Sequence, residues 1–293
     1  MGAEQIARAV GDQQWLDDVA SPLQEAIRKL FESAGRGGRE AKKFLHGSAL
    51  GHPLHPALIE LPVGAWTLAA IFDAIELADG RQRGRIADKA IGVGLIGAAA
   101  AAVAGITDWS ETDGRAKRIG LAHGAMNLTA TGLYVLSLLL RRNSRSAGIG
   151  VGMMAFGLAM SSAFLGGHLT YGEQIGVDHT ATADQGKPEQ YVAVLDASEL
   201  AENKPTRVTA EGVAVLLVKQ GEKIFALTET CSHLGGPLSK GKLEGDSIRC
   251  PWHGSRFCLT DGHVLDGPAV FPERVFDVRV REGQIEVRAR QEQ

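Results

Sequence analysis

Four long apolar segments dominate the first part of the chain. They cover residues 57–78, 90–107, 119–140 and 148–169, and each contains few charged side chains. At about 1.5 Å of rise per residue, helices of this length span roughly 27 to 33 Å, which is enough to cross a bilayer. The pattern predicts four transmembrane helices, and a soluble helical bundle rich in Ala and Gly is the alternative.

Before these segments, apolar residues recur at three- and four-residue steps from Glu4 to Phe31. This spacing predicts one or two amphipathic helices with a break near Ser21-Pro22, because serine followed by proline is typical of a helix start. We expect this N-terminal segment, residues 1–44, to pack on its own protein or to form a contact in a homo-oligomer, and binding to a membrane surface is the alternative. Within it, residues 35–39 are predicted to be a flexible basic link.

After residue 169 the pattern changes from long apolar runs to short ones. Polar residues 176–188 predict a linker, and strand-like runs follow at 191–195, 213–218, 224–227, 247–250, 256–259, 275–280 and 285–287. Several of these runs are followed by a polar residue and a glycine, a pair that is typical of hairpin turns. The pairs are Gln220-Gly221, Glu244-Gly245, Asp261-Gly262 and Glu282-Gly283. The sequence thus predicts two domains: an all-α four-helix transmembrane bundle (45–175) and an all-β sandwich or barrel (189–290).

Charge and cysteine content narrow the function. The chain has 31 basic and 34 acidic residues and a net charge of −3, so no overall electrostatic attraction to nucleic acid is expected. It has three cysteines. Two of them belong to the motif described next, and Cys258 is expected to be a small buried residue of a strand. The chain offers no candidate disulfide, which favours a reducing compartment.

The candidate chemistry lies in two short segments of the β domain. Cys231-Ser-His233 and Cys250-Pro-Trp-His253 each offer one thiolate and one imidazole. In a Rieske [2Fe–2S] centre two thiolates hold one iron and two imidazoles hold the other, so each segment could present one ligand to each iron. Zinc is the alternative metal, although finger-type sites usually pair Cys with Cys and His with His locally.

The two segments and their surroundings resemble the cluster loops of Rieske-type ferredoxins, over roughly residues 188 to 290. High-potential respiratory Rieske proteins carry one further cysteine in each loop, where this chain has Gly236 and Trp252, so the resemblance implies no disulfide. It also implies that Ser255 donates a hydrogen bond to a cluster sulfur, which raises the reduction potential. Phe257 stands where high-potential members tend to have tyrosine, which implies a low to intermediate potential.

Polar residues within the apolar segments are expected to gather at one membrane face. Because four is an even number of spans, both chain ends lie on the same side of the membrane. Four histidines lie near the span ends on that side: His52, His55, His123 and His168. Ionisable groups at a membrane edge are costly and often mark a function. The histidines could bind haem b, a metal or a quinone, or they could form a purely structural polar cluster.

Residues 45–180 resemble a family of small bacterial four-span membrane proteins of unassigned function that open with an HPLHP motif, here His52 to Pro56. The resemblance implies the cell (inner) membrane as the location and says little about chemistry. The positive charges flanking the two faces are equal in number, so they do not fix the orientation. We expect the β domain to be cytoplasmic. Export through Arg141-Arg142 as an internal twin-arginine signal is the alternative.

These patterns together predict a membrane-anchored electron-transfer protein. Its Rieske centre is expected to exchange electrons between a soluble redox partner protein and a quinone or haem at the membrane face. No nucleophile–base pair or ligand triad for mononuclear iron is evident in the β domain. We therefore expect no catalytic residues, and we do not expect this chain alone to oxygenate a substrate. A membrane-bound redox sensor, or an assembly or adaptor protein carrying the same cluster, is the alternative.

Overall fold

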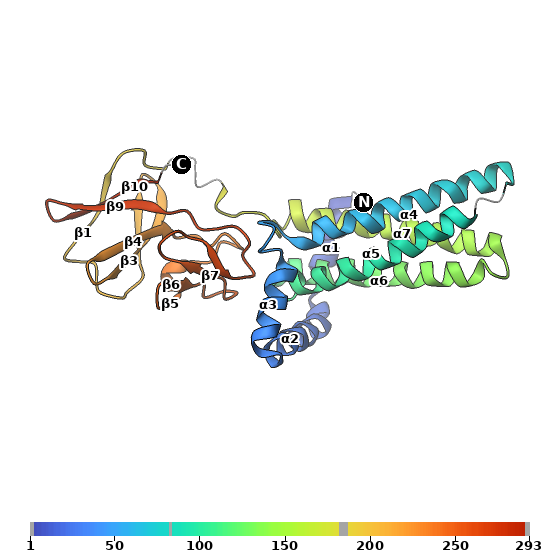
Figure 1. Cartoon of the computed structure of the whole chain (residues 1–293), viewed down its shortest axis with the longest axis horizontal. Coiled ribbons are helices and arrows are strands. Elements are labelled where there is room, and N and C mark those ends of the chain that lie inside the picture. The colour runs from blue at the N-terminus through green and yellow to red at the C-terminus, as the bar shows by residue number, and fades with distance from the viewer. Residues whose placement is uncertain (1–2, 82–83, 182–186, 291–293) are drawn as a thin grey trace. The chain divides into compact units, whose positions relative to one another are not determined.

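The chain forms two compact units, one helical and one built of strands (Figure 1). The computed structural model describes residues 3–81, 84–181 and 187–290. The first unit comprises Met1–Leu45 and Pro53–Ile175, and the second comprises His46–His52 and Gly176–Gln293. Of the predicted linker, residues 182–186 lie outside the described residues.

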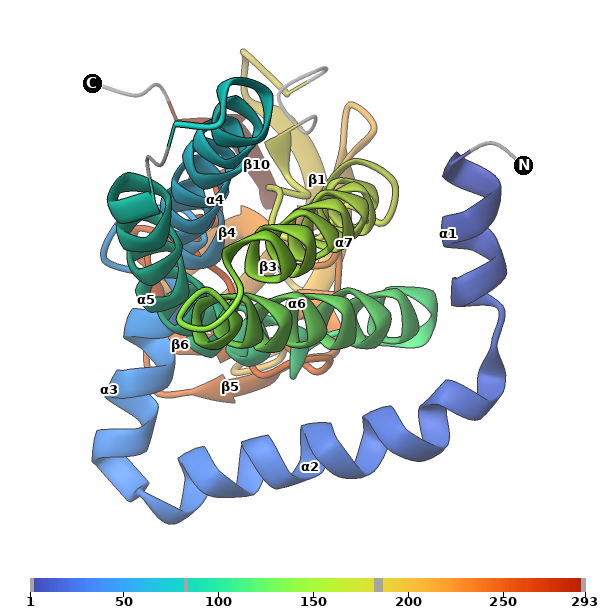
Figure 2. The same ribbon diagram turned by 90° about the vertical axis from the view of Figure 1, so that its right-hand side faces the viewer.

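The helical unit consists of a four-helix core and a shorter N-terminal part. The core helices are α4 (Leu54–Asp79), α5 (Gly84–Trp109), α6 (Gly114–Leu140) and α7 (Arg145–Tyr171). The N-terminal part contains α1 (Ala3–Gly11), the 3₁₀ turn η1 (Gln14–Leu16), α2 (Asp17–Ser33) and α3 (Gly35–His46). Figure 2 looks along the core, and α1 to α3 follow one another around its outside.

The four core helices pack as two helical hairpins, α4 with α5 and α6 with α7. In the centre, the Trp66 ring stacks on the Tyr134 ring with centroids 4.4 Å apart and an interplanar angle of 25°. A Cβ atom at Gly94 would lie 2.2 Å from Trp66 Nε1. Glycine at position 94 of α5 therefore allows close contact with α4.

Among the described residues, three helices are long and apolar enough to cross a membrane by length and composition: Leu54–Asp79, Arg85–Trp109 and Arg145–Tyr171. Helix α6 is as long as α7 but less apolar. Its first turns carry Arg115, Lys117 and Arg118, and His123 and Asn127 follow inside the helix. The polar residues that make α6 a candidate site thus lower its apolar character, and the count of four spans stays a prediction.

Two predictions for the N-terminal segment are wrong. Helix α2 runs through Pro22 without a break, and the chain instead leaves the helical conformation between Gly11 and Gln14. Residues 35–39 are not a flexible link, because they form the first turns of α3. Only Gly35, with φ of +58°, marks the change of direction between α2 and α3.

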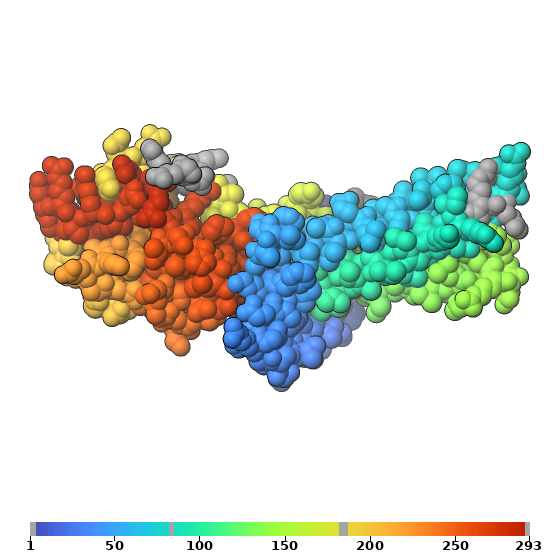
Figure 3. Space-filling model, viewed as in Figure 1, coloured from blue at the N-terminus to red at the C-terminus, as the bar shows by residue number. Residues whose placement is uncertain are grey.

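The N-terminal helices pack against the core, as expected, and form the blue part of the surface in Figure 3. Ala7 of α1 is fully buried together with Ile119 of α6 and Leu165 of α7. Asp17 at the start of α2 accepts hydrogen bonds from Arg118, which lower the pKa of its carboxyl to about 2, with help from Lys117. Helices α1 and α2 are thus held against α6 by both apolar and ionic contacts.

A network of ion pairs closes the bundle at the end where α4 and α6 finish. The buried Arg141 guanidinium donates to Asp73 (Nη1–Oδ1 2.8 Å) and to Asp88 (Nη1–Oδ1 2.9 Å), and a second bond joins it to Asp73. Arg145 adds a hydrogen bond to Glu76 (Nε–Oε1 2.5 Å). Charges inside an apolar bundle are tolerated only when paired in this way.

The second unit contains three antiparallel sheets. Their strand orders are β1-β10-β9, β2-β3-β4 and β5-β6-β7-β8. The strands are β1 (Val192–Asp196), β2 (Thr206–Ala210), β3 (Val213–Gln220), β4 (Lys223–Thr228), β5 (Lys242–Glu244), β6 (Ser247–Arg249), β7 (Arg256–Cys258), β8 (Val264–Asp266), β9 (Phe276–Arg281) and β10 (Gln284–Ala289). The prediction of β sheets in this half is confirmed.

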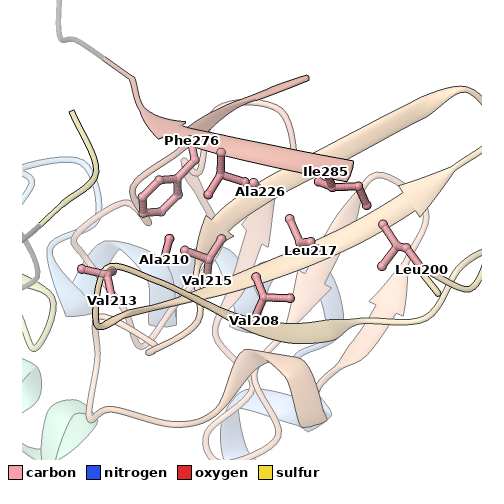
Figure 4. Close-up of a cluster of buried hydrophobic side chains, with 10 residues drawn as sticks. Leu200, Val208, Ala210, Val213, Val215, Leu217, Ala226, Phe276 and Ile285 are labelled. Atoms are coloured by element: carbon pink, nitrogen blue, oxygen red, sulfur yellow. The ribbon is translucent and has the colours of Figure 1, made fainter. Parts of the chain in front are cut away.

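The sheet core is made by alternate residues of the two three-stranded sheets (Figure 4). Val215 and Leu217 of β3 are fully buried and meet Ile285 of β10. The prediction missed β2, β5 and β8, because β5 and β8 have only three residues each and β2 carries few apolar ones. The turn signals are correct: Gly221, Gly245, Gly262 and Gly283 all have positive φ values between flanking strands.

Candidate metal centre

Two turns with the same hydrogen-bond pattern carry the predicted ligands. In the first turn the Cys231 N–H donates to Gly236 O (2.8 Å) and the Gly235 N–H donates to Cys231 O (2.9 Å). In the second, the Cys250 N–H donates to Ser255 O (2.8 Å) and the Gly254 N–H to Cys250 O (3.2 Å). Each turn therefore begins with a cysteine and is closed on itself.

A glycine at the fifth position makes each turn feasible. Gly235 has φ of +77° and Gly254 has φ of +76°, a conformation that other residues rarely adopt. The first turn follows β4, and the second connects β6 to β7. The sheet framework thus holds both turns, and the turns fix the direction of the cysteine side chains.

The two turns bring the cysteine thiols into contact. Cys231 and Cys250 are both buried, with 1% and 4% exposure. The Cys231 thiol donates a hydrogen bond to Cys250, and this bond, together with the N–H groups of Trp252 and His253, lowers the pKa of Cys250 to about 6. The same bond and burial raise the pKa of Cys231. One proton shared between two buried sulfurs is the state expected of a thiol pair arranged to bind a metal.

The two histidines lie beside each other as well. The His233 and His253 rings have centroids 5.1 Å apart and an interplanar angle of 83°. Both residues are partly exposed, whereas both cysteines are buried. The structure thus brings all four predicted ligand residues together, with the sulfurs on the inside and the imidazoles nearer to the surface.

Ser255 lies where it can support the second turn. Its side chain is fully buried, and its Oγ accepts a hydrogen bond from the Ala269 N–H (3.0 Å). Because that bond occupies an acceptor position of the hydroxyl, the O–H remains available to donate. This arrangement fits the donor role that the sequence implies for Ser255, and it links the second turn to a third loop around residue 269.

Glu273 is a buried residue of the site that the sequence did not suggest. Its carboxyl is 2% exposed, and its Oε1 accepts a hydrogen bond from the Ser232 N–H (2.7 Å) inside the first turn. The Oε2 atom is buried without a hydrogen-bond partner. Burial raises the pKa of Glu273 well above its usual range. This carboxyl comes from a segment forty residues further along the chain, so no local pattern could reveal it.

Comparison with known proteins identifies the centre. Residues 190–279 match the family described as Rieske [2Fe-2S] domain. Ferredoxin CarAc of Metapseudomonas resinovorans is 37% identical over 98 residues, which is 33% of this chain and 92% of the ferredoxin. The chain belongs to the Rieske family.

Two further relatives share the Rieske domain. The ferredoxin component of biphenyl 2,3-dioxygenase from Rhodococcus jostii is 32% identical over 87 residues, 30% of this chain and 81% of that protein. Apoptosis-inducing factor 3 of Homo sapiens is 32% identical over 122 residues, 42% of this chain and 20% of that protein. The Rieske domain is thus similar to ferredoxins of dioxygenase systems and implies a [2Fe–2S] cluster. The buried thiol pair and the adjacent imidazoles fit such a group.

The helical unit matches a second family. Residues 51–179 match the family described as Predicted membrane protein (DUF2231). Together with the three apolar helices, this match supports association with a membrane. The chain therefore joins a Rieske domain to a membrane protein domain, as the two resemblances in the sequence suggest.

The four histidines of the helical part are only partly brought together. His55 of α4 and His123 of α6 have ring centroids 6.5 Å apart. His168 at the end of α7 instead faces Glu173, with Nε2 3.6 Å from Oε1. His52 belongs to the segment His46–His52, which groups with the second unit. The candidate site in the bundle is thus reduced to the pair His55 and His123.

Proposed function

We propose that this protein is a membrane-anchored electron-transfer protein whose [2Fe–2S] cluster is held by Cys231, Cys250, His233 and His253. When bound, the cluster takes up and releases one electron at a time. The observation that carries the proposal is the pair of matched turns, which place two buried thiols in contact and two imidazoles 5.1 Å apart. The two thiolates would hold one iron and the two imidazoles the other.

The protein residues divide the remaining tasks. Burial of Cys231 and Cys250 keeps water away from their sulfur atoms. Ser255 offers an O–H donor to a cluster sulfur, and this hydrogen bond stabilises the reduced state of the cluster. His233 and His253 form the partly exposed edge through which electrons pass to a partner. Trp252, beside His253 and 57% exposed, gives this edge an apolar contact surface. Such a surface suits a short-lived complex with a soluble redox protein.

The soluble partner is proposed to belong to an oxygenase system, because the similar ferredoxin of Rhodococcus jostii is a component of biphenyl 2,3-dioxygenase. On the membrane side, the proposed partner is a haem or a quinone at the bundle histidines. Their geometry supports this choice. His55 Nδ1 lies 2.8 Å from Ala101 O, and His123 Nδ1 lies 2.9 Å from Ser162 O.

These two contacts fix the state of both rings. A carbonyl oxygen only accepts hydrogen bonds, so each Nδ1 carries a proton and each Nε2 is an acceptor. The Nε2 atom of His123 accepts a hydrogen bond from Asn127 Nδ2 (3.1 Å), which a metal or a quinol would have to displace. This is the arrangement of histidines that ligate a metal or accept a proton from a quinol. A Cβ atom at Gly105 would lie 2.8 Å from the His55 ring, and one at Gly166 would lie 3.0 Å from the His123 ring. Because glycine has no side chain, Gly105 and Gly166 leave the space that the two imidazole rings occupy.

The first experiment tests the cluster. The full chain, purified in detergent, should contain about two irons and two acid-labile sulfides, and dithionite should bleach its visible absorption and produce a Rieske EPR signal. Re-oxidation of reduced membranes by a quinone analogue would favour electron transfer over the alternative of a redox sensor or adaptor. A colourless protein that contains zinc in place of iron would refute the proposal.

The second experiment tests the bundle histidines. We expect either a haem signal or quinol-dependent reduction of the cluster, and His123→Ala should abolish whichever is present. His168→Ala is the matched control, because His168 is also near a helix end but pairs with Glu173. Equal loss in both variants, or no loss in either, would show that the pair has only a structural role.

We place the protein in the cell (inner) membrane with both chain ends and the Rieske domain on the cytoplasmic side. The ion pairs of Arg141 support this orientation, because a buried arginine bonded to Asp73 and Asp88 is poorly placed to act as an export signal. A reporter fused to the C-terminus that folds only in the cytoplasm should be active. An active periplasmic reporter would reverse the orientation.

A further inference from the structure

The third cysteine begins a third turn of the same kind. The Cys258 N–H donates to His263 O (3.0 Å), and the Gly262 N–H donates to Cys258 O (3.0 Å). Gly262 has φ of +73°, close to the values of Gly235 and Gly254 in the two cluster turns. The turn between β7 and β8 thus repeats the backbone of the cluster turns, and the proposed electron transfer makes no use of it.

Three side chains that can ligate a metal meet on this turn. Cys258, Asp261 and His263 each offer one ligand atom, and these atoms all lie within 4.8 Å of one another. His263 Nδ1 is 2.5 Å from Asp261 Oδ1, and the Cys258 thiol is hydrogen-bonded to the same carboxyl. One thiol, one carboxyl and one imidazole therefore converge within six residues.

The backbone holds this set in place before any ion binds. The Asp261 carboxylate accepts the His263 N–H (3.2 Å), and Gly262 O accepts the Glu273 N–H (2.9 Å). A Cβ atom at Gly262 would lie 1.9 Å from Glu273 O, so only glycine fits there. Because the turn is tied at both ends and in the middle, the three donors need little reorganisation to bind an ion.

The ligand set favours one class of ion. Thiolate, imidazole and carboxylate together suit Zn²⁺, and a site of three protein ligands leaves a fourth, tetrahedral position for water or another ligand. The thiolate and the carboxylate supply two negative charges to balance the ion. The side chains of Asp261 and His263 are 58% and 54% exposed, so the ion has an open path to them.

We propose that Cys258, Asp261 and His263 form a surface binding site for Zn²⁺, separate from the iron–sulfur centre. The nearest alternative is a turn that binds no ion, in which the hydrogen bond between His263 and Asp261 adds to the backbone bonds that close the turn. In that case Cys258 would be a spectator. The two differ in the role of the thiol, because a local hydrogen bond between Asp261 and His263 does not need Cys258.

Metal binding to the full, iron-loaded protein in detergent tests the proposal. We expect one equivalent of Zn²⁺ in competition with a chromogenic chelator, with the iron content unchanged. Cys258→Ser, Asp261→Asn and His263→Asn should each weaken binding by about tenfold or more. Glu282→Gln is the matched control, because Glu282 is an exposed acid in the equivalent Glu-Gly turn between β9 and β10.

Thiol labelling gives a second readout, which reports on the Cys258 thiol itself. With the other two cysteines ligated by the cluster, Cys258 is the one thiol of the sequence open to a maleimide. Saturating Zn²⁺ should block its labelling in the wild type but not in His263→Asn. The proposal fails if Cys258→Ser binds Zn²⁺ as tightly as the wild type, or if Zn²⁺ uptake is matched by loss of iron, since the ion would then occupy the cluster ligands. Absence of binding at Zn²⁺ on the order of 100 µM would also overturn it.

Discussion

Gly236 and Cys250 lie so close that a single methyl group would separate the two cluster turns. A Cβ atom at Gly236 would lie 2.8 Å from Cys250 Sγ and 3.2 Å from the Trp252 ring. Gly236 closes the first turn, and Cys250 opens the second. The position at which high-potential relatives are expected to carry a further cysteine is thus a point of close approach between the two turns.

Gly236→Ala should disrupt the centre. The added methyl group must push Cys250 away from Cys231, and buried overpacking of this kind costs about 1–3 kcal/mol. We expect a large loss of bound iron while the fold is retained, measured as iron per chain and as circular dichroism. Gly245→Ala is the control. It adds a strain that Gly236→Ala does not, because Gly245 has φ of +58°, but nothing lies within 4 Å of its new methyl group. Full iron loading of Gly236→Ala would contradict the tight contact.

Cys250→Ser should remove the cluster, whereas Cys258→Ser should keep it. Both changes replace a thiol by a hydroxyl at the end of a short strand or the start of a turn, but only Cys250 contacts Cys231. We expect about two irons per chain in Cys258→Ser and almost none in Cys250→Ser, with the EPR signal following the iron. A cluster that survives in Cys250→Ser would mean that the ligands are assigned wrongly.

Ser255→Ala should lower the reduction potential of the cluster. A hydrogen bond to a charged acceptor contributes about 1.5 kcal/mol or more, and for a one-electron couple about 1.4 kcal/mol corresponds to roughly 60 mV. We therefore expect a fall of roughly 60 mV or more in a redox titration followed by visible absorption. Ser239→Ala is the control, since its Oγ donates to Glu229 (2.6 Å). An unchanged potential would show that Ser255 only holds the loop at Ala269.

The sequence was informative about the site wherever its residues are close together in the chain. The spacing of Cys231 with His233 and of Cys250 with His253 predicts two pairs of candidate ligands, and the structure brings these residues together because each pair sits on one turn. Glu273 could not be predicted, because its contact with Ser232 arises only when β9 folds against β4. The side chains of the turn at Cys258 could not be predicted to meet, because they are brought together by the hydrogen bonds that close the turn between Cys258 and His263.

The helical unit shows the same division. The lengths of the four apolar segments predict the positions of the four long helices, since a long run of apolar residues favours a helix that is packed in a bundle or in lipid. Which polar residues meet was less predictable. His55 and His123 come together from α4 and α6, whereas His168 turns to Glu173, because rotation and register of the helices decide these contacts. Ser21-Pro22 predicts a helix start, but α2 begins at Asp17 and includes Pro22.

Asp73→Asn should destabilise the bundle strongly. Asp73 and Arg141 are both almost fully buried, and loss of the Asp73 charge leaves the Arg141 guanidinium paired only with the more exposed Asp88. Removal of a partner from a buried ion pair costs about 3–5 kcal/mol. We expect a clear fall in the thermal unfolding temperature in detergent. Arg142→Ala removes a neighbouring but exposed arginine and should have little effect. Equal stability of Asp73→Asn and the wild type would show that Asp88 alone can balance Arg141.

Glu273 should make the stability of the Rieske domain fall as pH rises. Burial raises its pKa in the folded state well above 4.5, so the folded protein keeps a proton that the unfolded chain has already released. The contribution of Glu273 to the free energy of unfolding is therefore fully present below the pKa of the unfolded state. It is lost as pH rises through the pKa of the folded state, at about 1.4 kcal/mol per pH unit.

Glu273→Gln removes this dependence while keeping an oxygen that can accept the Ser232 N–H. The wild type and the variant should have similar unfolding temperatures near pH 4.5, and the variant should become the more stable of the two as pH rises. Unfolding temperatures of both proteins over a series of pH values, followed by loss of cluster absorption, measure the difference. Glu244→Gln provides the opposite sign: Arg249 lowers the pKa of Glu244, so its contribution is lost as pH falls. Parallel pH profiles for the wild type and Glu273→Gln would show that the buried carboxyl gains its charge without cost.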